Sequence, residues 1–264
     1  MTAAAMFNLR MPNLRYNRIY WVLFAGITVL ILYSAVAHKK SSFAESTVVE
    51  VVPLEGGSKL ISESDVRQAL LRAFGNTLEG TELGHLEVER MERVLEEDPF
   101  VEKADTYVDQ RNNLHVRIRQ RAPMLRILDN NGGNYYLDKN GVKMPPSKNF
   151  TARVIVGTGN VAPYVQEFRQ KKRSTLKDLF TLTNVILKDE FLSNFIQQIH
   201  VNNAGEFILV PLIGEQKILI GGVRRLDDKI RRLKIFYKEG MPYAGWKEYQ
   251  AINLKYAGQV VCKR

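Results

Sequence analysis

The motif with the clearest catalytic spacing is S-x-x-K, at Ser174-Thr175-Leu176-Lys177, in which a lysine helps to activate a nucleophilic serine for acyl transfer. Its usual companions do not follow: the chain has no Lys-Thr-Gly, and the triplet Ser147-Lys148-Asn149 precedes the serine instead of following it. We interpret Ser174 as a helix N-cap and Lys177 as a solvated residue of the first turn. A serine acyl hydrolase stays open as an alternative.

A second motif, Gly157-Thr158-Gly159-Asn160-Val161-Ala162, formally fits G-x-G-x-x-A, the phosphate-binding turn of dinucleotide folds. Pro163 follows at once, and no strand-helix-strand pattern surrounds the glycines. We therefore interpret the motif as a glycine turn at the end of a strand, and we expect no cofactor.

The sequence gives little support for a metal site, a disulfide bond or a nucleic-acid-binding site. The four histidines lack ligand spacing, and Cys262 has no second cysteine to pair with. The net charge of +10 permits anionic partners but selects none. Basic runs at 169–173 and 224–234 could steer an acidic partner or a membrane surface, or could be solvated helix faces. They lack the interleaved aromatic residues of a nucleic-acid platform. We expect no metal, nucleic acid, small-molecule substrate or catalysis.

An apolar segment near the amino end sets the topology. Residues 19–37 carry no ionisable Asp, Glu, Lys, Arg or His, and as a helix they would be roughly 28 Å long, close to the ~30 Å hydrocarbon core of a bilayer. The alternative is a cleaved signal sequence ending at Ala35-Val36-Ala37, but the run is longer than a usual signal core. Three arginines and no acid precede it, which predicts a cytoplasmic tail at 1–18 and an exported remainder.

The exported part begins with a compact β-α-α-β-β pattern. TVVEVV at 47–52 predicts a strand, Ser62 with Asp65 has capping-box spacing before a helix that stops at Gly75, and a second helix is expected at about 87–97. A short strand leads to a turn at 110–113, and the alternation of Leu114, Val116 and Ile118 predicts a further strand.

A second region of mixed strands and helices follows Pro123. Its expected strands lie at 135–137, 152–156, 195–201, 206–211, 217–220 and 252–256, and its helices lie at 174–187 and 226–238. The fold class is therefore α+β. We expect a linker at 38–45, one domain at 46–122, and a second domain with an antiparallel sheet at 123–264.

The first domain resembles the POTRA domain of the bacterial FtsQ/DivIB division proteins. The resemblance rests on the strand TVVEVV, the helix SESDVRQALLRAF, the step Asp98-Pro99-Phe100-Val101-x-x-Ala104, and Asn113-Leu114-x-Val116-x-Ile118-x-Gln120-Arg121-x-Pro123. Two departures are Gln110-Arg111, where the family usually has Trp-Pro, and Gln120, where it usually has Glu. A POTRA-containing membrane-protein assembly factor is a further alternative, but it would need a transmembrane barrel that the second region does not suggest.

The carboxyl-terminal strand carries the site that the resemblance implies. Lys255 stands where the family has a basic residue and Tyr256 where it has an aromatic one, and Asn253 replaces the commoner Asp. In that family this region receives FtsB and FtsL, partly by adding a partner strand to a sheet edge. The implied partner-binding residues are Ile252, Leu254, Lys255, Tyr256, Gly258 and Val260. Tyr256→Lys or Leu254→Pro is then expected to abolish FtsB capture without unfolding the domain.

The resemblance further implies a bitopic inner-membrane scaffold of the divisome. It would lie at the division septum with its carboxyl-terminal domains in the periplasm, and it would link FtsB- and FtsL-type proteins and further division components.

Overall fold

The structure, a computed structural model, describes residues 14–75, 77–245 and 248–264. Its first element is helix α1 (Leu14–Lys40), in which Tyr20–Lys40 contains an 18-residue window with a mean hydropathy of 2.0 and is long and apolar enough to cross a membrane. The helix extends past both ends of the expected 19–37 span. Most of the expected cytoplasmic tail, residues 1–13, lies outside the described part of the chain.

The first sheet unit, residues 47–120, has the expected β-α-α-β-β order. Its strands form a three-stranded sheet in the order β1-β3-β2, with β1 and β3 parallel and β2 and β3 antiparallel. The elements are β1 (Thr47–Val52), α2 (Glu63–Phe74), the short η1 (Leu83–His85), α3 (Val88–Glu96), β2 (Val101–Val108) and β3 (Leu114–Gln120).

Local sequence explains where α2 begins and ends. The Ser62 hydroxyl accepts from the Asp65 amide, and the Asp65 carboxylate accepts from the Ser62 amide, so the capping box is present. Hydrogen bonds that the Ser62 hydroxyl and the Ser62 amide donate to the Asp65 carboxylate lower its pKa. Gly75 closes the helix with a φ of +75°. The helix buries Val66 and Leu70 against the sheet and α3.

The second sheet unit, residues 123–263, is built on a nine-stranded sheet within the described residues, in the order β12-β11-β10-β9-β8-β7-β4-β5-β6. Its strands are β4 (Pro123–Asp129), β5 (Asn134–Asp138), β6 (Lys143–Met144), β7 (Ile155–Gly159), β8 (Ile196–Val201), β9 (Phe207–Pro211), β10 (Lys217–Gly221), β11 (Ala251–Asn253) and β12 (Val261–Lys263). Its helical elements are η2 (Phe168–Gln170), α4 (Thr175–Leu187), α5 (Glu190–Phe195), α6 (Leu226–Ile235), the π-helical η3 (Phe236–Gly240) and α7 (Met241–Ala244).

The α+β class is confirmed, but the sheet is mixed where we expected an antiparallel one. β4 and β7, β7 and β8, and β10 and β11 pair in parallel. For the last two pairs the reason is the helical connections: α4 and α5 return the chain between β7 and β8, and α6 through α7 do so between β10 and β11. Each crossover starts the next strand from the same end as the last.

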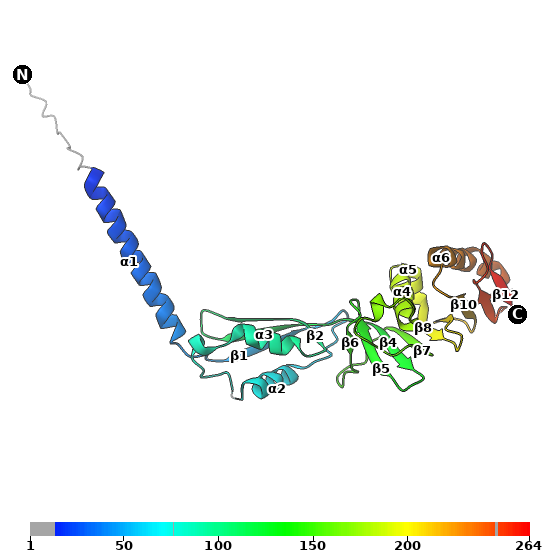
Figure 1. Cartoon of the computed structure of the whole chain (residues 1–264), viewed down its shortest axis with the longest axis horizontal. Coiled ribbons are helices and arrows are strands. Elements are labelled where there is room, and N and C mark those ends of the chain that lie inside the picture. The colour runs from blue at the N-terminus through cyan, green and yellow to red at the C-terminus, as the bar shows by residue number, and fades with distance from the viewer. Residues whose placement is uncertain (1–13, 76, 246–247) are drawn as a thin grey trace, which may run out of the picture.

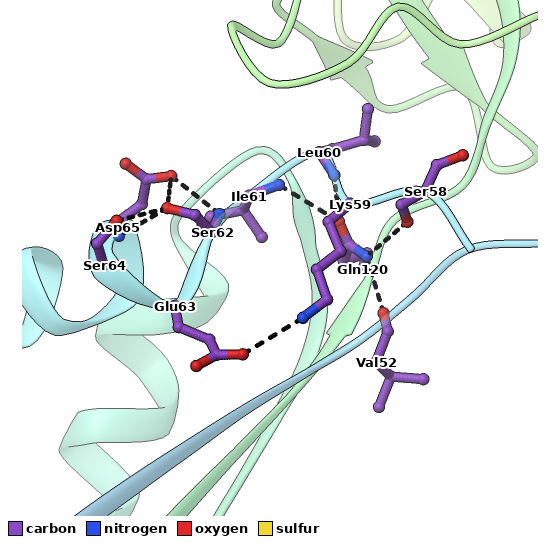
Figure 2. A network of polar contacts seen from close by, with 10 residues as sticks. All are labelled: Val52, Ser58, Lys59, Leu60, Ile61, Ser62, Glu63, Ser64, Asp65 and Gln120. Atoms are coloured by element: carbon purple, nitrogen blue, oxygen red, sulfur yellow. Dashed lines mark hydrogen bonds and ion pairs between the residues drawn. The ribbon is translucent and has the colours of Figure 1, made fainter.

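The last residue of β3, Gln120, holds the 52–61 loop of the first unit, whose Leu60 packs against the second unit. The buried Gln120 amide serves four backbone groups: its oxygen accepts from the Leu60 and Ile61 amides, and its nitrogen donates to the Val52 and Ser58 carbonyls, as Figure 2 shows. A carboxylate could not make the two donor bonds, so glutamine rather than the family's usual glutamate fits this loop.

Arg121 then fastens the second unit to the first. Its guanidinium donates to the Pro99 and Val101 carbonyls at 3.1 and 2.8 Å and pairs with Asp138 of β5 at 2.9 Å. Asp138 is only 2% exposed. Leu60 packs beside this pair against Tyr136 and Met144 of the second unit. Figure 1 shows the resulting arrangement: α1 and the carboxyl terminus lie at opposite ends of an elongated molecule.

Candidate partner-binding surface

The strand expected at 252–256 is shorter than the sequence suggested. β11 ends at Asn253, whose side-chain oxygen accepts from the Lys255 amide at 2.9 Å and turns the chain away. A turn over 254–260 follows, in which Gly258 has a φ of +72°. The chain then returns as β12, a strand that we did not predict from the sequence.

This hairpin moves the free edge of the sheet. β11 is paired on both sides, in parallel with β10 and antiparallel with β12, so the expectation that the 252–256 strand forms an edge is wrong. The edge is β12, which has no strand on its outer side among the described residues. An unpaired edge of this kind is a template for another chain.

The hydrogen bonds of β11 indicate which backbone groups of β12 face outward. The Gln250 carbonyl accepts from the Lys217 amide and the Leu254 amide donates to the Leu219 carbonyl, so Ile252, which lies between them, faces β10. The Gln250 amide, just before β11 begins, donates instead to the Lys263 carbonyl of β12. The odd-numbered positions of β11 then face β12, where Val261 and Lys263 lie opposite them. In an antiparallel pair such opposite residues exchange both bonds. We infer that the backbone groups of Cys262, between them, point to the open side.

The six residues predicted to bind a partner divide by exposure. Ile252 and Leu254 are fully buried in the core of the second unit, and Val260 packs partly against that core. Lys255, Gly258 and Tyr256 are exposed, the last by 53%. Leu254→Pro is therefore not a clean test of binding, because it would remove a bond to β10 and disturb the core.

Arg232 on α6 holds the turn in place. Its guanidinium donates to the carbonyl oxygens of Leu254 at 3.3 Å, Tyr256 at 2.9 Å and Gln259. Asp228, one helical turn earlier, orients it through a bond of 2.9 Å, and the Arg232 side chain is only 11% exposed. The helix thus fixes the path of the chain from β11 into β12.

Lys255 ties the other side of the turn to Glu206, the residue just before β9. Its ammonium pairs with Glu206, which lowers the pKa of that carboxyl and raises the pKa of Lys255. Beside it lies a hollow of about 330 Å³. The hollow is lined mainly by charged residues, with five basic side chains against two acidic ones: Arg224, Arg225, Lys229, Arg232 and Lys255, and Glu206 and Asp228.

The basic run at 224–234 is therefore only partly a solvated face. Lys229 is 8% exposed and donates to the Ile220 and Gly222 carbonyls at 2.8 and 2.7 Å. Burial lowers its pKa. Arg232 is likewise engaged with the backbone. The only signal in the sequence for the role of Arg232 is its i+4 spacing from Asp228. The carbonyl groups that Arg232 bonds lie more than twenty residues away in the chain.

The two catalytic-looking motifs have structural uses. The Ser174 hydroxyl accepts from the Lys177 amide at 3.4 Å as the N-cap of α4, as expected, while the Lys177 ammonium donates to the Lys171 carbonyl at 2.9 Å. Gly159 ends β7 with a φ of +92°, and a Cβ there would lie 2.1 Å from the Val201 carbonyl oxygen. The glycine is thus required by the close approach of β8. Within the described residues, no group of three His, Cys, Asp or Glu could hold a metal ion.

Comparison with known families gives two matches. Residues 122–263 match the family described as FtsQ/DivIB, C-terminal related, and residues 52–119 match the POTRA-like domain. No curated protein matches the chain significantly. Proteins of these two families are typically non-enzymatic scaffolds, and together with the apolar helix α1 the matches indicate a division-related, single-pass membrane protein. Because the first match spans more than half of the 264 residues, the chain belongs to the FtsQ/DivIB family.

Proposed function

We propose that this protein is a bitopic inner-membrane scaffold that recruits FtsB- and FtsL-type division proteins at the septum and has no catalytic activity. The amino-terminal tail, residues 1–18, is cytoplasmic. The domains at 46–122 and 123–264 are periplasmic, and the helix confines them to the membrane surface. Confinement raises the effective concentration of each partner, so modest interfaces are enough for assembly.

The observation that carries the proposal is the open edge at β12 beside a turn that is held from two sides. A partner strand laid along β12 would gain main-chain hydrogen bonds from groups already in an extended arrangement. Arg232 and Lys255 fix the adjoining turn in advance, which reduces the ordering cost of association. The exposed Tyr256 ring supplies apolar contact area next to that edge.

The basic hollow adds a preference for charge. With five basic and two acidic side chains around it, it favours a partner segment that places a carboxylate beside the added strand. Such charge complementarity mainly speeds encounter and selects among partners.

The test is capture of an FtsB-type protein by the full chain in membranes, comparing Tyr256→Lys with Tyr107→Lys. Tyr107 is a matched control because it lies on β2 of the first unit and is 54% exposed, against 53% for Tyr256. We expect Tyr256→Lys to lower capture at least tenfold and Tyr107→Lys to leave it unchanged. Equal capture by both variants would contradict the site.

A further inference from the structure

A lysine at the end of α1 bonds this helix to the first unit. The Lys39 ammonium, in the last turn of α1, donates to the carbonyl oxygens of Asp109 and Gln110, both at 3.1 Å, and to the side-chain oxygen of Asn112. These acceptors all lie in the turn between β2 and β3, about seventy residues later in the chain. Lys39 therefore uses three donors on one short loop, which residues 109–113 form.

The loop also has hydrogen bonds of its own. The Asp109 carboxylate accepts from the Arg111 and Asn113 amides at 2.7 and 2.9 Å and pairs with His115 at 3.0 Å. Bonds from Asn113 and His115 hold the pKa of Asp109 well below its usual range. Asn112 adopts the left-handed φ of +63° within this turn, a conformation that asparagine tolerates better than most residues. The loop is a preformed acceptor site.

The chain after α1 is also fastened. The Ser42 carbonyl accepts from the Leu83 amide at 2.8 Å, and Ala44 exchanges bonds with Thr81 and Gly80 at 2.9 and 2.8 Å. The segment at 38–45, which we expected to be a linker, is thus helical through Lys40 and bonded to the first unit beyond it. The direction of α1 relative to the first unit is set by these contacts.

The bonds to Lys39 determine the depth of the loop relative to the bilayer. If residues 19–37 span the hydrocarbon core, Lys39 follows at about 3 Å along the helix axis, at the level of the phospholipid headgroups. The loop bonded to Lys39 lies at that level too. Around it, Lys40 and Arg111 are exposed, and the Phe43 ring is 61% exposed. The acidic neighbours are Glu82, which is paired with His85, and the exposed Glu45, whose amide donates to the Asn112 carbonyl.

We propose that this end of the first unit rests on the phospholipid surface, with Arg111 and Lys40 at headgroup phosphates and the Phe43 ring at the interface. Basic side chains are attracted to anionic headgroups, and aromatic rings favour the headgroup level. The contact orients both sheet units relative to the bilayer. It rests on α1 spanning the membrane and does not depend on partner capture at β12.

The test uses depth-dependent quenching in the full chain, in nanodiscs that contain anionic phospholipid carrying a headgroup quencher. A fluorophore is placed at Gln110→Cys in a Cys262→Ser background. The matched control is Asn130→Cys in the turn of the second unit, because Asp129 accepts from the Asn131 and Gly133 amides there as Asp109 does in its own turn. Both labelled positions are exposed.

We expect quenching at residue 110 to exceed that at residue 130 at least threefold, and Arg111→Glu to reduce the excess by half or more. Lys39→Met should reduce it as well while the circular dichroism stays unchanged. Equal quenching at the two positions would overturn the proposal, and so would an excess that neither Arg111→Glu nor Lys39→Met alters.

Discussion

Replacing Arg232 by Met tests whether α6 holds the turn that leads into β12. The variant keeps most of the aliphatic stem and removes the three bonds to the Leu254, Tyr256 and Gln259 carbonyls. Bonds from a charged donor are worth up to about 1.5–3 kcal/mol each, but two of these lie at exposed positions, where water replaces them. We therefore assign a stabilising free energy of about 0.7 kcal/mol to each of the three bonds and about 2 kcal/mol to all three together.

That free energy is local, because the bonds lie at one end of the sheet. Since 1.4 kcal/mol corresponds to a factor of ten, local opening of the turn and β12 should become about 30-fold more populated. Native-state hydrogen exchange on the full chain in nanodiscs measures this directly. Amides of residues 254–263 should exchange about 30-fold faster, while those of β3 keep their rates.

Arg231→Met is the control for this change. Arg231 also bonds Asp228 at 2.9 Å, but its side chain is 72% exposed and contacts none of the three carbonyls. We expect less than a threefold change for it. If the amides of residues 254–263 exchanged at the same rate in the Arg232→Met and Arg231→Met variants, the role assigned to Arg232 would be refuted.

Three further predictions concern the junction and the turn. Gln120→Glu should lower the free energy of unfolding by about 2 kcal/mol in urea titrations at pH 7, because a carboxylate leaves the Val52 and Ser58 carbonyls without a donor; an unchanged midpoint would count against the network. Arg121→Met should lower the free energy of unfolding by about 3 kcal/mol, because the Asp138 carboxylate stays buried with its two loop amide bonds but without its cation. Adding Asp138→Asn should recover part of this lost stability. The pKa of Glu206 lies below its ordinary 4.5, so the contribution of its ion pair is complete above that value and is lost as pH falls through the folded-state pKa. Amide shifts of residues 254–260 should therefore titrate at a pH below 4.5, and Glu206→Gln should abolish that titration.

Local signals in the sequence predicted local structure well. The Ser62 and Asp65 spacing identified the start of α2 because the capping bonds join residues three positions apart. The helical spacing of apolar residues likewise located α3 and α4 to within one residue. The length and composition of α1 predicted a possible membrane span without reference to any neighbour.

The site was harder to predict because its determinants are distant in the chain. The alternation from Ile252 to Tyr256 is typical of a strand, but the Asn253 side chain captures the Lys255 amide and ends it. β12 has too few residues to show a pattern. Arg232 is one of several basic residues on α6, and only the folded chain brings the turn carbonyls to it. In the sequence, Lys39 likewise looks like an ordinary basic residue at the end of an apolar helix.

The central claim is that a partner strand pairs with the outer side of β12, and one comparison tests it most directly. Cys262→Pro removes the backbone N–H that points outward, at an edge position where proline is tolerated, while Cys262→Ala changes only the side chain. The measurement is the dissociation constant of the full chain in nanodiscs for an FtsB-type protein. We predict that Cys262→Ala binds like the unmodified chain and that Cys262→Pro binds at least tenfold more weakly, with unchanged circular dichroism. Equal affinity for the two variants would contradict strand addition at this edge.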